Sequence, residues 1–195
     1  MKSFLGCVAV LALTFFLLSF SSLVYDRGHW ESLQEKYGVN MTKAQPLNGV
    51  ILSYFKDTNY FSGPTYPGLT EKEQQHMLDV KKRVNVIMIF SLIFCATSFF
   101  ILKLSTNRKK LLIAAGIAAF LLPLLFFIFP FESTFLRFHQ LFFHEGSFWF
   151  EPGDLLVNIY PQNFFADFAF GIVVRAWMLA ALSLVIGLFL YRKKN

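Results

Sequence analysis

Four long apolar runs constrain the fold of this chain more than any other feature. They cover residues 4–24, 84–102, 111–129 and 168–191. The hydrocarbon core of a bilayer is about 30 Å thick, and a helix crosses it with about 20 residues because each residue rises about 1.5 Å. Every run is close to that length. The sequence therefore predicts an all-α membrane protein, a four-transmembrane-helix bundle forming a single integral membrane domain over residues 1–195.

The composition agrees with a membrane protein and excludes several other classes. Hydrophobic residues make up 55% of the chain and charged residues only 15%, whereas soluble domains are about 45–50% apolar. This composition excludes a disordered chain and a disulfide scaffold. Cys7 and Cys95 both fall inside apolar runs, so neither a disulfide nor a CxxC redox centre is expected. Because no A-x-A-like site follows the first run, we expect it to be an uncleaved anchor.

The distribution of charge predicts the orientation in the membrane. All twelve acidic residues and nine of the 18 basic residues lie in segments 25–83 and 130–167, and Arg175 is counted with them. The other eight basic residues flank the ends that a four-span topology places on one side: Lys2, Lys103, Arg108, Lys109, Lys110, Arg192, Lys193 and Lys194. The positive-inside rule then puts both termini in the cytoplasm and directs loops 25–83 and 130–167 outward. The net charge of +6 thus reflects topology, and no nucleic-acid partner is expected.

The first outward loop is long enough for a small extracytoplasmic cap. Residues 26–37 and 46–55 are expected to form short helices, and residues 62–68 are rich in turn formers. Thr70 and Glu73 then match a capping box, in which Thr is the N-cap and Glu follows three residues later. This pattern predicts a helix that begins near Glu71 and runs unbroken into the second span, to residue 102.

A group of ionisable residues lies on that helix before the apolar run begins. Asp79 follows His76 by three residues and Arg83 follows Asp79 by four, so the three share one face. Histidine is a suitable general base because its ordinary pKa of about 6.5 is close to working pH, and a carboxylate can orient its ring. The alternative is a solvated interfacial helix with ordinary charges.

The second outward loop contains an unusually aromatic segment. Residues 131–143 are rich in Phe but include Glu132, Arg137 and His139, so an interfacial or re-entrant segment is expected rather than a fifth span. We expect His139 to lie at about the depth of His76. Two histidines at the level of lipid ester bonds indicate acyl chemistry, although an aromatic belt at the membrane surface would have a similar composition.

Other histidines and other chemistries are weaker candidates. His29 is expected near the end of the first span, and His144 precedes a polar stretch and is expected to be exposed. No HxxxH or HExxH spacing is present, so no metal is expected, and no nucleotide motif indicates a cofactor. No G-x-S-x-G elbow supports a serine hydrolase.

Arg175 and two prolines also require an explanation. Arg175 falls inside the fourth apolar run, where an arginine costs about 2.5–3.5 kcal/mol at the helix centre and commonly has a function. It could snorkel toward phosphates, hold a lipid carbonyl, or pair with a carboxylate of the outer loops (Glu132, Asp154 or Asp167). Pro123 is expected to kink the third span and Pro130 to end it.

Several motifs, taken in order, resemble one known family. They are Tyr37-Gly38-Val39, the EQQHMLDVK sequence at residues 73–81, FHQLFF at 138–143, and Trp149-Phe150 followed by DLL at 154–156 and Pro161-x-x-Phe164-Phe165. The pattern resembles the bacterial integral-membrane family of lipoprotein intramolecular transacylases. The likeness spans nearly the whole chain.

This resemblance implies a substrate, a reaction and a location. The family moves the sn-2 acyl chain of a diacylglyceryl-cysteine lipoprotein to the α-amino group of the same cysteine, which gives a lyso-form lipoprotein. Two histidines are implicated in catalysis, and by motif they correspond to His76 and His139. The resemblance further implies a multi-pass protein of the bacterial plasma membrane, with membrane lipid and diacylglyceryl lipoproteins as partners and an active site facing outward.

For the mechanism, we expect His76, oriented by Asp79, to accept the amine proton. His139 would stabilise the oxyanion or protonate the leaving alkoxide, and Arg175 would have a supporting role. A histidine acting as a transient acyl carrier is an alternative. Two other functions also fit the sequence: a non-catalytic four-helix membrane partner or transport-accessory protein, and a phospholipid acyltransferase or lipase.

Overall fold

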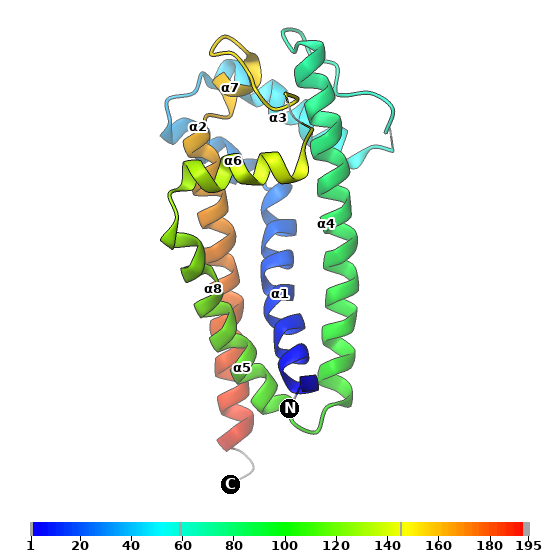
Figure 1. Ribbon diagram of the computed structural model, residues 1–195, viewed down its shortest axis with the longest axis vertical. Helices are drawn as coiled ribbons and strands as arrows, with labels where there is room; N and C mark the ends of the chain where they lie inside the picture. Colours follow the sequence, from blue (N-terminus) through cyan, green and yellow to red (C-terminus); the bar gives the residue numbers. More distant parts are fainter. Residues whose placement is uncertain (1, 59, 145, 193–195) are drawn as a thin grey trace. The chain divides into compact units, whose positions relative to one another are not determined.

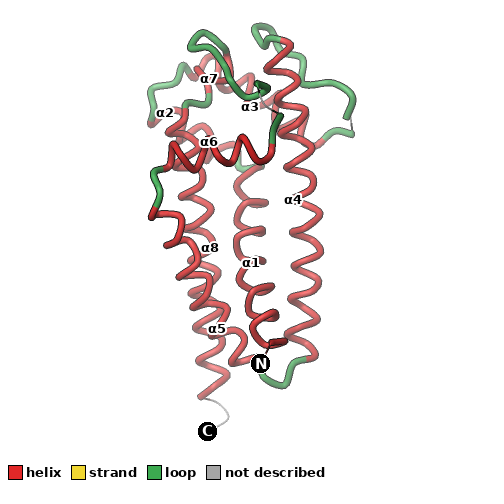
Figure 2. Tube along the Cα trace, viewed as in Figure 1, coloured by secondary structure: helices red, strands yellow, loops and turns green. Residues whose placement is uncertain are grey.

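The computed structural model describes residues 2–58, 60–144 and 146–192. Helices joined by loops make up this part of the chain, and it contains no strand (Figure 2). The helices are α1 Lys2–Val24, α2 Arg27–Lys36, α3 Met41–Lys56, α4 Glu71–Leu104, α5 Arg108–Leu121, η1 Leu122–Ile128, α6 Phe131–Phe142, α7 Leu155–Ile159 and α8 Gln162–Arg192.

Packing divides the chain into two compact units, each described by itself. The bundle unit comprises Met1–Ser22, Ile87–Ile128 and Phe170–Asn195. The histidine unit comprises Leu23–Val86 and Phe129–Ala169 and contains all four histidines. Figure 1 shows the labelled helices from which the two units are built.

Three helices are long and apolar enough to cross a membrane: Ser3–Val24, Glu71–Leu104 and Gln162–Arg192. They include three of the four expected spans, so the predicted all-helical membrane fold is confirmed at this level. The third expected span, 111–129, is divided between α5 and the 3₁₀ helix η1. Pro123 explains the change because it lacks the N–H that an α-helix needs at this position. The helical segment ends at Ile128, shortly before Pro130, as the sequence predicts.

Small side chains allow close helix packing in the bundle unit. Ala12 of α1, Ala119 of α5 and Ala180 of α8 form one buried cluster. Gly116 lies where a Cβ atom would be only 2.6 Å from Cγ of Leu184 on α8. Small residues at such contacts are characteristic of membrane helices, since van der Waals packing holds these helices together.

Hydroxyl groups add hydrogen bonds between helices of the same unit. Thr14 of α1 bonds Ser98 of α4 at 2.8 Å between the two oxygens, and the Ser183 hydroxyl donates to the Leu112 carbonyl at 2.9 Å. Arg175 donates from Nη1 to the Ser22 hydroxyl at 2.9 Å. The arginine in the fourth apolar run therefore bonds a neighbouring helix.

Buried amides hold the core of the histidine unit. Gln34 of α2 and Asn48 of α3 exchange two hydrogen bonds of 3.1 and 2.7 Å. The Tyr160 hydroxyl donates to Oδ1 of Asn48 at 2.6 Å. The two short helices expected in the first loop are confirmed as α2 and α3. Helix α3 begins at Met41, earlier than expected, because the Asn40 side chain caps it by accepting from the Thr42 amide at 3.0 Å.

Candidate active site

The predicted capping box fixes the start of the helix that carries His76. Oε2 of Glu73 accepts from the Thr70 amide at 2.8 Å and from the Thr70 hydroxyl at 3.0 Å, while the Glu73 amide donates to that hydroxyl at 3.2 Å. Helix α4 then runs unbroken from Glu71 to Leu104. The predicted helix start is confirmed, and His76 lies in the second turn.

Glu73 also fixes a second element, which the sequence does not predict. Its other carboxylate oxygen, Oε1, accepts from the Leu156 amide at the start of α7 at 2.7 Å. The Glu73 side chain is completely buried. Because one carboxylate bonds both segments, the beginning of α4 is tied to α7.

The two predicted catalytic histidines lie together. The imidazole rings of His76 on α4 and His139 on α6 are stacked, with centroids 6.2 Å apart and planes inclined by 15°. The Phe143 ring contacts both, at centroid distances of 4.9 Å from His76 and 5.3 Å from His139. Phe150 packs edge-on against His76 at 5.2 Å. His76 is only 8% exposed, so the pair lies in a largely apolar enclosure.

This enclosure keeps both rings uncharged at neutral pH. Burial lowers the pKa of His76 to about 4, with a further decrease from His139 and a smaller opposing effect of Asp79. Burial also lowers the pKa of His139 from 6.5, and the hydrogen bond to the Phe135 carbonyl partly opposes this effect. His76 precedes the apolar stretch 84–102 of α4, and His139 lies on another helix, α6.

A hydrogen bond identifies the tautomer of His139. Nδ1 of His139 lies 2.8 Å from the Phe135 carbonyl oxygen. Because a carbonyl can only accept, Nδ1 must carry the proton, and Nε2 of the neutral ring has a free lone pair. Nδ1 of His76, by contrast, is buried without a hydrogen-bond partner among the described residues. The two rings are therefore not equivalent.

Asp79 influences His76 through its charge. Across the described ranges no hydrogen bond joins the two side chains, and Oδ1 of Asp79 lies 3.6 Å from Nζ of Lys82. The effect of Asp79 on His76 in the structure is electrostatic, and it raises the pKa of the histidine.

Arg83 and Lys72 each bond the backbone carbonyl of the residue that precedes an aromatic residue of the enclosure, Phe143 and Phe150 respectively. Arg83 donates from Nε and from Nη2 to the Phe142 carbonyl, at 3.1 and 2.9 Å. Lys72 donates from Nζ to the Trp149 carbonyl. The sequence places Arg83 on the His76 face, but nothing in the sequence indicates that its partner is a carbonyl.

The predicted aromatic segment forms helix α6, and Phe rings from this helix and from the chain after it surround His139. Phe135, Phe138 and Phe148 have ring centroids 4.2, 5.4 and 5.3 Å from that of His139. Phe138 is 48% exposed, and Leu141 and Phe142 of the same segment are exposed as well. The concentration of Phe beside His139 expected from the sequence is confirmed.

The other two histidines lie elsewhere in the unit. His144 is exposed in a turn after α6, where its carbonyl accepts from the Ser147 amide at 3.1 Å. His29 lies in α2, with its ring 6.1 Å from Phe168. Among the residues described, no three His, Cys, Asp or Glu side chains are grouped so as to hold a metal ion.

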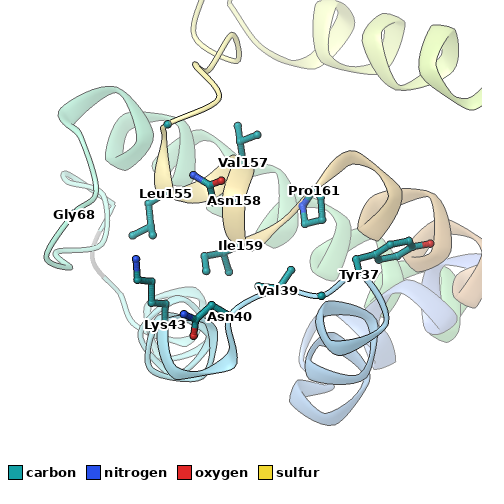
Figure 3. A pocket seen from close by; sticks show the side chains of 12 residues that line it. Tyr37, Val39, Asn40, Lys43, Gly68, Leu155, Val157, Asn158, Ile159 and Pro161 are labelled. Atoms are coloured by element: carbon teal, nitrogen blue, oxygen red, sulfur yellow. The ribbon is translucent and has the colours of Figure 1, made fainter.

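A separate hollow of about 640 Å³ lies on the histidine unit (Figure 3). Lys43 of α3 and Leu155 of α7 lie on its walls, and the segment from Tyr37 to Asn40 forms another side. Its size is in the range of ligand sites. Neither His76 nor His139 lines it, so the groups suited to acyl transfer lie outside this hollow.

Comparison with known proteins identifies the family. A sequence profile described as "Lipoprotein intramolecular transacylase Lit" matches residues 1–165. The chain belongs to the lipoprotein intramolecular transacylase family. The resemblance found in the sequence motifs is thereby confirmed, and this membership assigns the chain to a family of acyltransferase enzymes.

Solved structures of this family have the same fold. The membrane integral transacylase Lit from Bacillus cereus superimposes with a TM-score of 0.78 at 19% identity, covering 98% of this chain and 95% of that one. A variant of the same protein with a histidine replaced by arginine gives the same score and identity, with 98% and 91% coverage. An alanine variant at the same histidine gives 0.76 and 20%, with 98% and 93% coverage.

One further relative is known from sequence. An uncharacterized protein of Aquifex aeolicus (strain VF5) is 29% identical over 126 residues, which is 61% of this chain. The chain spans just over half of that protein's length, 56%.

Proposed function

We propose that this chain transfers the sn-2 acyl chain of a diacylglyceryl-cysteine lipoprotein to the α-amino group of the same cysteine, giving the lyso form. The observation that carries the proposal is the pair of neutral, stacked imidazoles of His76 and His139 inside an aromatic enclosure. Family membership supports it, and in two structures of the Bacillus cereus relative one histidine has been substituted.

The reaction needs one proton to move from nitrogen to oxygen. The neutral α-amine attacks the sn-2 ester carbonyl, the new C–N bond forms, and the C–O bond to the glyceryl group breaks. We assign the proton transfer to His139: Nε2 accepts the proton from the attacking amine and then delivers it to the leaving sn-2 oxygen. Nδ1 keeps its proton, held by the Phe135 carbonyl. The products are an amide and a free hydroxyl, and His139 ends the cycle neutral.

His76 would act by a hydrogen bond without losing its proton. A neutral imidazole is a poor acid but a good N–H donor, so His76 is suited to stabilising the negative carbonyl oxygen of the tetrahedral intermediate. This assignment reverses the roles expected from the sequence, in which His76 is the base. The charge of Asp79 raises the pKa of His76. Arg175 would support lipid binding within the bundle unit by holding a lipid carbonyl or phosphate.

The aromatic wall and the single substrate molecule would supply the rest of the catalysis. Phe rings around His139 offer an apolar surface for the migrating acyl chain. Donor ester and acceptor amine belong to one molecule, so holding it in a folded conformation replaces an encounter between two molecules. Four spans with both termini in the cytoplasm, as the basic flanks indicate, would place this chemistry at the outer face of a bacterial plasma membrane.

The test uses purified protein and a synthetic diacylglyceryl lipopeptide with a deuterated sn-2 chain. Transfer is an isomerisation and leaves the total mass unchanged, so tandem mass spectrometry must locate the label. We expect the label to move to the N-terminal amide, and an N-acetylated lipopeptide to remain unchanged. Mixing labelled and unlabelled lipopeptides of different sequence should give no crossed products. Release of free deuterated fatty acid would instead indicate a lipase and contradict the proposal.

The lowered pKa of both histidines predicts how the transfer rate depends on pH. Because burial lowers the pKa of both histidines below 6.5, their neutral forms prevail above that pH, and the substrate amine, with a pKa of about 7.7–8.0, becomes the last group to lose its proton. The transfer rate should therefore rise about tenfold per pH unit between pH 6.5 and the amine pKa and then level off. Initial rates from pH 5 to 9 check this. A plateau that begins near pH 6.5 would mean that histidine ionisation controls the rate.

A further inference from the structure

One face of α4 carries two cations on either side of His76. Lys72, His76, Asp79 and Arg83 follow one another at intervals of four, three and four residues, which places them on the same side of the helix. Lys72 and Arg83 are exposed, while His76 between them is buried. Arg83 donates to the carbonyl of the last residue of α6, and Lys72 donates to a carbonyl in the chain that follows α6.

The two carbonyls lie close to the two ends of the segment that covers the histidines. We call the described residues 143–144 and 146–150 the covering segment. Phe142, whose carbonyl accepts from Arg83, immediately precedes it, and Trp149, whose carbonyl accepts from Lys72, lies near its end. Phe143 and Phe150 of the covering segment both contact the His76 ring. The contacts with α4 are thus made at both ends of the segment.

We propose that Arg83 and Lys72 are positioning residues that hold the covering segment against the histidine pair. The proposal rests on the proposed function for its effect on turnover. Neither cation contacts the reacting atoms: they act on Phe143, Phe150 and the end of α6, and through these on the two rings.

The end of α6 explains why an arginine suits the first contact. The last carbonyls of a helix lack intrahelical partners, and the planar guanidinium can offer two N–H groups to one of them. Phe142 is less than one turn beyond His139, and the Phe143 amide donates to the His139 carbonyl at 2.9 Å. A hydrogen bond that holds the Phe142 carbonyl in place therefore also holds the turn of backbone that carries His139. Lys72 supplies one donor and a cation over the Phe150 ring, 5.5 Å from its centroid.

The kinetic test compares Arg83→Gln with Arg27→Gln. Arg27 is a matched control because it is an arginine of the same unit whose Nη2 also donates to a carbonyl, that of Gln45 at 3.1 Å, but it lies on α2. With the labelled lipopeptide, Arg83→Gln should lower kcat about tenfold with little change in KM, since misplaced catalytic groups slow the chemical step. Arg83→Lys should recover part of the loss, and Arg27→Gln should match the unmodified protein.

A second measurement needs no turnover. Diethylpyrocarbonate acylates accessible neutral imidazoles, and peptide mass spectrometry gives the rate at each histidine without substrate. Arg83→Gln should speed modification of His139 several-fold, and Lys72→Gln should speed that of His76, whereas Arg27→Gln should change neither. If both histidines react in the Arg83 and Lys72 variants as they do in the control, the positioning proposal is wrong.

The two measurements separate this proposal from the proposed function. Faster labelling of the histidines in a protein that transfers no acyl chain would support the positioning role and contradict the function. If Arg83→Gln fails to fold, Arg83→Lys and Lys72→Gln carry the same comparison. Unchanged kcat and unchanged labelling in those two variants would overturn the proposal.

Discussion

Replacing His139 with alanine is expected to lower the rate of acyl transfer about 10³-fold. Proton transfer by a positioned side chain contributes about 10²–10⁴-fold, and Nε2 of His139 is the base in the proposed reaction. The change removes the ring but leaves α6 intact, because alanine is the best helix former. The measurement is the initial rate of label migration in the lipopeptide, with the circular dichroism spectrum as a check on folding.

His76→Ala should have a similar but smaller effect, because it removes one hydrogen-bond donor to the oxyanion, which is worth about 10²–10³-fold. The double variant should be scarcely slower than His139→Ala alone, since residues that act as a unit give strongly non-additive losses. His144→Ala is the matched control: this histidine is exposed and follows α6 directly after the covering aromatic residue Phe143. Equal losses in the control and in His139→Ala, or multiplicative losses in the double variant, would contradict the dyad.

Local sequence patterns predicted much of the fold. The capping box at Thr70 and Glu73 predicted the first residue of α4, since the bonds that define it join residues three apart. Apolar length predicted four membrane helices, of which three are long and apolar enough to cross a membrane, and Pro123 predicted the disturbed third span. Each of these signals depends on neighbours in the chain, so no knowledge of tertiary packing is needed.

The candidate site depends on contacts that no local pattern determines. The His76 and His139 rings meet across more than sixty residues of chain, and their pairing came from the family resemblance and a shared depth. The acceptor on Nδ1 of His139 is a backbone carbonyl, which every residue has, so its sequence carries no signal. The same holds for Arg83, whose partner is the Phe142 carbonyl.

Asp79 illustrates how a correct spacing can mislead. A carboxylate three residues after a histidine on a helix can reach it, and the sequence therefore favoured Asp79 as the group that orients the His76 ring. The side chain lies instead beside Lys82, which is also three residues away. His76 is buried and Asp79 only partly so, and the charge of the carboxylate raises the pKa of the imidazole.

Replacing Glu73 with alanine is expected to cause the largest loss of stability, about 3 kcal/mol. The change leaves the buried Leu156 amide and the Thr70 amide without their acceptor, and an unsatisfied buried donor costs about 1–3 kcal/mol. For a chain of this size the midpoint of thermal unfolding should fall by roughly 6–12 °C. Glu73→Gln should lose about half as much, because its amide oxygen can still accept from Leu156 while its NH₂ group faces the Thr70 donor.

The neighbouring Glu71 provides the control for this change. It lies in the same first turn of α4 but is exposed, so Glu71→Ala removes only a favourable charge near the helix N-terminus, worth about 0.3–1 kcal/mol. Unfolding of the three variants in one detergent, followed by scanning fluorimetry, separates a buried connection from a general effect of charge. Because Glu73 bonds both α4 and α7, its loss should also loosen the helix turn that carries His76. If Glu73→Ala and Glu71→Ala unfold at the same temperature, the buried carboxylate contributes no more than its charge, and α7 must be held by its apolar contacts.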